Sequence, residues 1–120
     1  MVNKDFENFK KYFKEYQRKF GLMGYKVYFK YELLDVGFTD ISIDISGMVA
    51  IVRLNSKLPD KDKPFKHIKQ SAMHEAIHLL LARLEKNGRY RYAAEAEISE
   101  ATEELVFKLE ELILGQTLRS

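Results

Sequence analysis

The stretch from residue 25 to residue 54, YKVYFKYELLDVGFTDISIDISGMVAIVRL, decides the fold. Apolar and polar side chains alternate along most of it, with a period of two that is typical of strands buried on one face. Short turns at Asp35-Val36-Gly37 and Ser46-Gly47 divide it into three candidate strands: Tyr25 to Leu33, Phe38 to Ile45, and Met48 to Leu54. Because the connections are short, we expect these strands to form a three-stranded antiparallel sheet, a meander.

Helical periodicity flanks these strands on both sides. Aromatic residues at spacings of three and four predict a helix over residues 4–20, which Gly21 would end. After a polar loop with two prolines, apolar spacing predicts a long helix over residues 65–86 and a C-terminal helix over residues 93–114. This order predicts an α+β fold, and 120 residues correspond to a single domain spanning residues 1–120.

Composition excludes several classes of protein. The chain has no cysteine, so disulfide scaffolds, thiolate nucleophiles and cysteine-bearing zinc fingers are excluded. No apolar run approaches the roughly 18–20 residues of a membrane helix, and the first residues lack the apolar segment of a secretory signal. These features predict a cytoplasmic protein without a membrane partner.

The net charge of +2 is small, but the charges are unevenly distributed. Residues 1–30 contain eight lysines and arginines and three acidic residues, whereas residues 95–112 contain seven glutamates and only Lys108 as a base. A basic first helix could contact nucleic acid. The sparse, one-sided lysines are more typical of a solvated helix face, which is the interpretation we prefer.

The segment His74-Glu75-Ala76-Ile77-His78 stands in the middle of the long predicted helix. Residues four apart share one helix face, so both imidazoles can reach a single ion, and zinc accepts imidazole nitrogen without needing cysteine. Glu75 projects about 100° around the helix from His74. From there its carboxylate can reach a water on the ion and take its proton as a general base. The spacing predicts a zinc centre with Glu75 as its catalytic residue.

These five residues resemble the HExxH motif of the zinc metallopeptidases called zincins. The order of elements is similar to that of small phage-encoded proteins assigned as metallopeptidases, and to the protease domains of the IrrE/ImmA and SprT-like groups. Residues 74–78 carry the resemblance, with a looser match around residues 100–109 and a similar general plan from about 48 to 113. The resemblance implies a minimal zincin-like fold, a bound zinc ion and a peptide or protein substrate.

A catalytic zinc usually has three protein ligands, so one must come from outside residues 74–78. The residues after His78 lack the glycine and the third histidine of the metzincin signature. His67 lies two turns before His74, about 10.5 Å away along the helix axis, so it can only face solvent or line a substrate cleft. A carboxylate remains, which resembles the arrangement in gluzincins.

The C-terminal helix offers several candidates for this carboxylate: Glu95, Glu97, Glu100, Glu103 and Glu104. We expect Glu103 to be the ligand because it borders the apolar stripe of the helix. Phe107 follows four residues later, a spacing similar to that in the third-ligand helix of the IrrE/ImmA group. Those proteins usually carry a small residue where this chain has Glu104, and Glu100 and Glu104 remain alternatives.

Two further features bear on substrate binding. A donor for the oxyanion could come from His67 or from the segment Tyr90-Arg91-Tyr92, although simple surface packing is the alternative for this segment.

The strand from Met48 to Leu54 precedes the motif helix, at the position where zincins present an edge to an extended peptide. An added peptide strand would bind there through main-chain hydrogen bonds.

Together, these observations predict a zinc-dependent metallohydrolase, most simply a peptidase, with His74, His78 and Glu103 as metal ligands. The alternative is a non-enzymatic binding or regulatory module on a zincin-like fold, associated with nucleic acid through its basic first helix. A zinc hydrolase that acts on a non-peptide amide is a third interpretation.

Overall fold

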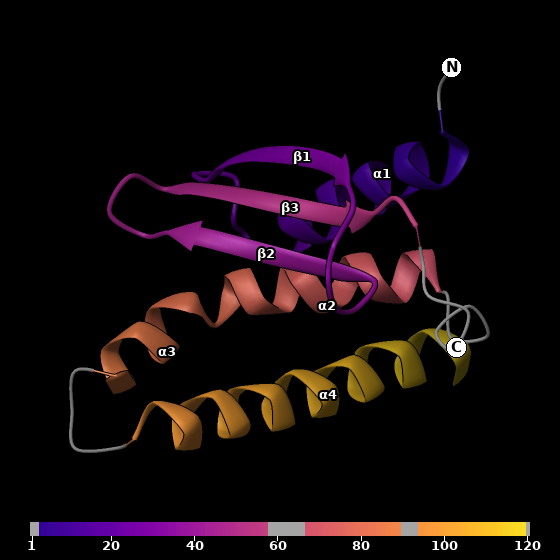
Figure 1. Ribbon diagram of the computed structural model, residues 1–120. Helices are drawn as coiled ribbons and strands as arrows, with labels where there is room; N and C mark the ends of the chain where they lie inside the picture. Colours follow the sequence, from indigo (N-terminus) through magenta and orange to yellow (C-terminus); the bar gives the residue numbers. More distant parts are fainter. Residues whose placement is uncertain (1–2, 58–66, 90–93, 120) are drawn as a thin grey trace.

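The computed structural model describes residues 3–57, 67–89 and 94–119, with side chains up to residue 114 (Figure 1). Its elements are α1 (Lys4–Lys19), β1 (Lys26–Glu32), β2 (Thr39–Asp44), β3 (Val49–Asn55), α2 (Ile68–Leu80), α3 (Ala82–Arg89) and α4 (Glu95–Arg119). The predicted α+β class is confirmed. Within the described residues, no helix combines the length and the apolar character needed to cross a bilayer.

The first helix and the three strands form close to where the sequence predicts them. The Asn3 side chain caps α1 by accepting a hydrogen bond from the Phe6 N–H at 3.0 Å. Gly21 follows the end of the helix with a φ of 72°, a left-handed conformation that favours glycine.

The predicted antiparallel meander is wrong, because the sheet is mixed. Its strand order is β1-β3-β2, with β3 antiparallel to β2 and parallel to β1. The most apolar strand, β3, takes the central position, where Ala50, Val52 and Leu54 are fully buried or nearly so. Strand β2 is consequently an edge strand, and the segment from Met48 to Leu54 offers no open edge to a peptide.

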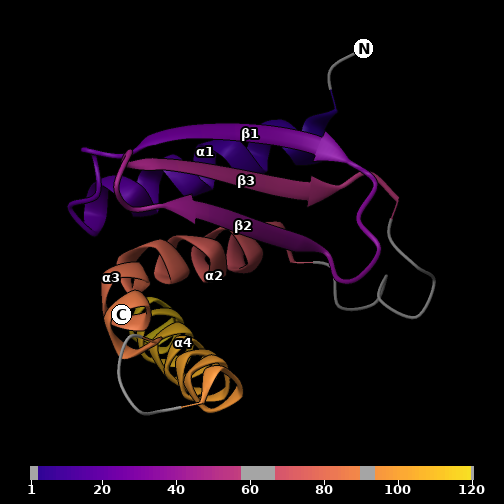
Figure 2. The same cartoon turned by 60° about the vertical axis from the view of Figure 1, so that its left-hand side comes forward.

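The core lies between one face of this sheet and helices α1 and α2. Phe29 of β1 packs edge-on against Phe9 and Phe13 of α1, with ring centroids 6.4 and 5.5 Å apart. The buried face of α2 is made of small and apolar side chains: Ala72, Met73, Ala76, Ile77 and Leu79. Helix α2 runs beside β2, and α4 lies on the side of α2 that faces away from the sheet (Figure 2).

The long helix predicted over residues 65–86 is two helices, α2 and α3. Leu81 separates them with φ −93° and ψ 3°, although its N–H still donates to Ile77 O at 3.0 Å. The break directs α3 toward α4, where Gly88 lies against Ile98. Residues 65 and 66 lie outside the described residues.

Helix α4 is longer than predicted and continues to Arg119, so Gly115 does not end it. It runs antiparallel to α2, because His78 contacts Glu103 whereas the earlier His74 contacts the later Glu110. The expectation that the C-terminal helix returns along the motif helix is confirmed. This arrangement places the acidic helix beside the two histidines.

Candidate metal centre

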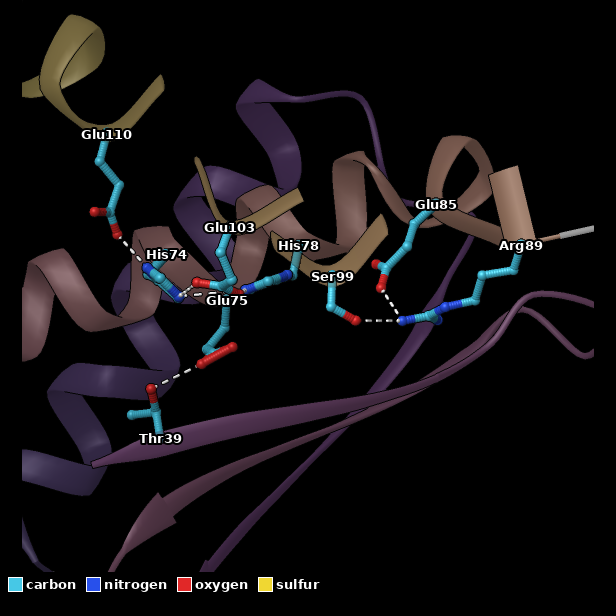
Figure 3. Close-up of polar contacts among 9 residues, drawn as sticks. All are labelled: Thr39, His74, Glu75, His78, Glu85, Arg89, Ser99, Glu103 and Glu110. Atoms are coloured by element: carbon cyan, nitrogen blue, oxygen red, sulfur yellow. Dashed lines mark hydrogen bonds and ion pairs between the residues drawn. The ribbon is translucent and has the colours of Figure 1, made fainter. Parts of the chain in front are cut away.

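Helix α2 presents its two histidines on the face opposite the core. Ala76 and Ile77 between them are fully buried, which fixes the orientation of the helix, while His74 and His78 are only partly buried. Their ring centroids are 4.9 Å apart, and the two Nε2 atoms approach to 3.2 Å (Figure 3). The i, i+4 spacing therefore brings two nitrogen donors to one point, as predicted.

Glu103 of α4 faces this pair of nitrogens. One of its carboxylate oxygens lies 2.6 Å from His78 Nε2, and the other lies 3.6 Å from His74 Nε2. Among the described residues, these three form a group whose donor atoms all lie within 4.8 Å of one another. The structure therefore brings together the three residues predicted as metal ligands, and their role as ligands stays a prediction.

The runner-up glutamates lie elsewhere on α4. Glu104 is exposed and forms an ion pair with Lys108 at 3.1 Å, and Glu100 is exposed. Neither belongs to the group of donors around the histidines. Of the three candidates for the third ligand, only Glu103 has the required position.

The spacing of the two imidazole nitrogens fits a tetrahedral zinc ion. Two Zn–N bonds of ~2.0–2.1 Å at a tetrahedral angle separate their nitrogens by about 3.3 Å. The two Nε2 atoms are 3.2 Å apart. Two imidazoles and one carboxylate are also the donor set of many catalytic zinc sites, in which a fourth position stays open. The chemistry of the three donors and the spacing of the two nitrogens therefore fit zinc.

Glu110 belongs to the candidate site, and the sequence interpretation missed it. Its carboxylate is almost fully buried and lies 2.5 Å from His74 Nδ1. An ionised carboxylate can only accept, so Nδ1 of His74 carries the hydrogen. When the ring is neutral, as a metal ligand must be, its Nε2 lone pair therefore faces the centre. The signal was present in the sequence, because seven residues after Glu103 corresponds to about two helical turns on the same face.

Glu75 is buried beside the centre and does not belong to the donor group. Its carboxylate accepts a hydrogen bond of 2.8 Å from the Thr39 hydroxyl on β2. Burial, opposed by the Thr39 hydrogen bond and the charge on His74, raises the pKa of Glu75 from 4.5 to about 7. A carboxyl group with this pKa can both take up and release a proton at neutral pH.

The two imidazoles have pKa values that shift in opposite directions. Burial lowers both, since it disfavours the charged form. For His74, the hydrogen bond to Glu110 and the neighbouring carboxylates outweigh burial and raise the pKa. For His78, burial and the charge on His74 outweigh the attraction of Glu103 and lower the pKa. The site therefore favours one positive charge on the pair, close to the carboxylates.

The raised pKa of Glu75 predicts how the stability of the metal-free protein depends on pH. Between pH 4.5 and about 7 the folded state binds more protons at Glu75 than the unfolded state, so stability falls as pH rises through this window. This shift in the pKa of Glu75, of two to three pKa units, corresponds to about 3 kcal/mol in the free energy of unfolding. We expect Glu75→Gln to stabilise the protein by an amount of this order at pH 8 and by little at pH 4.5, in urea unfolding with a chelator.

The control for this measurement is Glu104→Gln, which replaces an exposed carboxylate. It should change stability by a similar small amount at both pH values. An equal effect of Glu75→Gln at both pH values would contradict the raised pKa.

Two hollows adjoin the centre. The larger, of about 560 Å³, extends from Thr39 and His78 along β2 and α3 as far as Arg89. The smaller, of about 480 Å³, extends from Thr39 and His74 to His67. His67 is exposed and lines this smaller hollow, which is compatible with both predicted positions, facing solvent or lining a cleft. Tyr90, Arg91 and Tyr92 lie outside the described residues.

Comparisons of the chain with models of protein families, with curated proteins and with solved structures gave no match. The resemblance to zincins therefore stays a prediction, and the assignment of a function depends on the site itself.

Proposed function

We propose that this protein is a zinc-dependent peptidase in which His74, His78 and Glu103 hold the ion and Glu75 is the general base. The observation that carries the proposal is the convergence of three donors from two helices, of which the two imidazole nitrogens have the spacing that tetrahedral zinc requires. A buried carboxyl group stands beside them without joining them. This division between ligands and base is what metal-assisted hydrolysis needs.

When bound, zinc would lower the pKa of water and polarise the carbonyl group of the substrate. The protein's own residues supply the proton transfers. Glu75 can take a proton from the attacking water and give it to the leaving amine, because its pKa is near 7. The Thr39 hydroxyl holds the carboxylate in place. His74 is in turn oriented by Glu110, which fixes the ring nitrogen that faces the centre.

The edge of β2 supports a peptide as the substrate. Asn55 N–H donates to Phe38 O at 2.8 Å, so Phe38 and Asn55 form a hydrogen-bonded pair of the antiparallel ladder. Such pairs alternate with pairs whose backbone groups point away from the partner strand. The N–H and C=O groups of Thr39, Ile41 and Ile43 therefore point away from β3, along the larger hollow. An extended peptide could pair with them as a further strand.

The test of the proposed function is elemental analysis of the purified protein beside His74→Ala and His78→Ala. We expect about one zinc per chain in the original protein, and much weaker zinc binding in both variants, since each loses a nitrogen donor. Added zinc should raise the melting temperature only of the original protein. Absence of zinc, together with an unchanged melting temperature on its addition, would refute the proposal.

Glu110 provides a separate prediction. Glu110→Gln keeps the size of the side chain but removes the charge that orients and polarises His74. We expect zinc affinity to fall about 10–100-fold, as is typical when the partner of a metal-binding histidine is lost. Competition with a chromophoric chelator measures this change. Glu111→Gln, in the exposed neighbouring residue, is the control and should bind zinc normally. Equal affinities in the two variants would rule out this role of Glu110.

A further inference from the structure

The sheet has a second open edge, which is formed by β1. The strand order β1-β3-β2 places β1 on the side of the sheet opposite to β2. In Figures 1 and 2, α1 covers one face of β1, and none of the described helices or strands lies beyond its free edge. The edge of a sheet presents unpaired N–H and C=O groups, to which a further strand can bind. The proposed peptidase function uses only the opposite edge.

The pairing with β3 identifies which main-chain groups of β1 are free. Lys26, the first residue of β1, donates its N–H to Met48 O at 2.9 Å. Main-chain groups alternate in direction along a strand, so every second residue from Lys26 onward bonds to β3. The N–H and C=O groups of the residues between them, Val27, Phe29 and Tyr31, therefore point away from the sheet. They offer both donors and acceptors to an added strand.

Lysines flank this edge on both faces of the sheet. Lys26 and Lys30 are exposed on the face that points away from α1, and the ring of Tyr28 between them is 55% exposed. On the other face, Lys14 of α1 extends its Nζ to 5.9 Å from the centre of the Phe29 ring. A segment bound along the edge would therefore have ammonium groups near both of its faces.

Positive charge predominates along this edge. Glu32, the acidic residue of β1, already forms an ion pair of 3.0 Å with Arg53 of β3. Within the described part of the chain, the structure shows no ion pair for Lys14, Lys26 or Lys30. These three ammonium groups are therefore available to carboxylates of a partner.

Three kinds of partner could meet such an edge, and the contacts favour a peptide. A second copy of β1 would place two sets of the same lysines along one seam, and lysines at an edge are a common obstacle to such pairing. The phosphates of a nucleic acid would neutralise the lysines, but they would leave the C=O groups of Val27, Phe29 and Tyr31 without donors. An extended peptide pairs with the N–H and C=O groups together, and its carboxylates can reach the ammonium groups.

We infer that the free edge of β1 binds an extended acidic segment of a partner protein as an added strand. Lys26 and Lys30 are four residues apart on one face, a span of about 13 Å at 3.3 Å per residue. The segment should therefore carry two carboxylates at the same spacing, with an apolar residue midway against Tyr28. The inference goes beyond the proposed peptidase function and does not depend on the metal centre.

The probe is a blocked nonapeptide with two glutamates four residues apart and β-branched residues around them. It is added to the protein together with a chelator, which also prevents zinc-dependent cleavage. The amide hydrogens of Val27, Phe29 and Tyr31 should then exchange with solvent at least about tenfold more slowly, as read by NMR, because they donate to the peptide. A peptide with glutamine in place of glutamate should bind at least about tenfold more weakly.

The positions of slowed exchange distinguish the alternatives. Slower exchange at Thr39 and Ile41, without a change at Val27 and Phe29, would mean that the peptide binds to β2 and would overturn the inference. Slower exchange at Val27 and Phe29 at high protein concentration without peptide would mean that β1 pairs with a second copy, which would also overturn it. Tighter binding of an oligonucleotide of the same charge would assign the surface to nucleic acid and would overturn it too.

Charge reversal tests the lysines. The double variant Lys26→Glu, Lys30→Glu should bind the glutamate peptide at least about tenfold more weakly, and a matching lysine peptide more tightly, than the original protein does. The matched control, Lys11→Glu with Arg18→Glu, reverses two exposed charges of α1 outside the strand. Its affinity should stay within about threefold of the original, since solvent screens these charges. An equal loss in both double variants, or no loss in the first, would contradict the inference.

The backbone of the peptide tests strand pairing without any change to the protein. Methylation of alternate amide nitrogens removes either the N–H groups that face β1 or those that point away from it. Only one of the two methylated peptides should bind. Equal binding of both would show attraction by charge alone and would refute the added strand. Absence of zinc from the protein would refute the proposed function and leave this inference standing.

Discussion

Glu75→Gln is expected to lower the turnover of a peptide substrate by ~10²–10⁴-fold, the usual contribution of general-base catalysis. Glutamine has the size of glutamate and can still accept the hydrogen bond from Thr39, but it cannot take a proton. Since Glu75 is not among the donor atoms around the histidines, the variant should keep its zinc and its fold. Turnover and zinc content are measured on the same preparation.

The two readouts separate the possible interpretations. Unchanged cleavage would count against the mechanism, and loss of zinc would show that Glu75 is a ligand. A protein that uses this fold only for binding, including one that binds nucleic acid through α1, would lose no function in the variant. Glu104→Gln, which changes an exposed carboxylate on α4, is the matched control.

Glu103→Ala should have the second large effect, on zinc affinity. Removal of an outer residue that orients a ligand typically lowers metal affinity about 10–100-fold. Glu103 itself has the position proposed for a ligand, with a carboxylate oxygen 2.6 Å from His78 Nε2. We therefore expect its removal to lower zinc affinity by more than about 100-fold. The remaining two imidazoles would leave half of the tetrahedron without protein donors. Isothermal titration with zinc, in competition with a chelator, covers the range of affinities expected.

Two neighbouring glutamates on α4 are natural controls for this variant. Glu100→Ala and Glu104→Ala remove the same charge from exposed positions one turn or one residue away. They should bind zinc nearly as the original protein does, because neither carboxylate faces the donor group and solvent screens an exposed charge. Equal affinities across the three variants would refute Glu103 as the ligand and leave the two histidines in place.

The histidine pair was predictable because it depends only on helix geometry. Once residues 68–80 are helical, a spacing of four determines that His74 and His78 share a face. Glu103 was predictable for a similar reason, since a carboxylate beside the buried Val106 must point toward whatever α4 packs against. These predictions needed no knowledge of strand order.

The strand order itself was not predictable from the local pattern. Alternation identifies each strand, but it does not determine which strands become neighbours. Insertion of β3 between β1 and β2 made β2 the edge strand and brought Thr39 to Glu75. Thr39, the hydrogen-bond partner of the proposed base, is therefore placed by the pairing of β2 with β3. The sequence around residue 39 carries no signal for this strand order.

Glu110 was missed for a different reason. The prediction assigned one carboxylate to the site, although the same face of α4 continues for two further turns to Glu110. A histidine ligand needs a partner at its second ring nitrogen, so a second carboxylate on that face was a reasonable expectation. A prediction of a metal site should therefore name two things for each histidine: the ion at one ring nitrogen and the hydrogen-bond partner at the other.

Because both carboxylates that contact His74 and His78 belong to α4, the order of synthesis has a consequence for this protein. On the ribosome, the two histidines emerge well before residues 103 and 110. A nascent chain that ends before α4 has both imidazoles of the candidate centre but neither of these carboxylates. The site can therefore be completed only after α4 has been translated, which, for the proposed peptidase, would keep an unfinished polypeptide from cleaving itself or its neighbours.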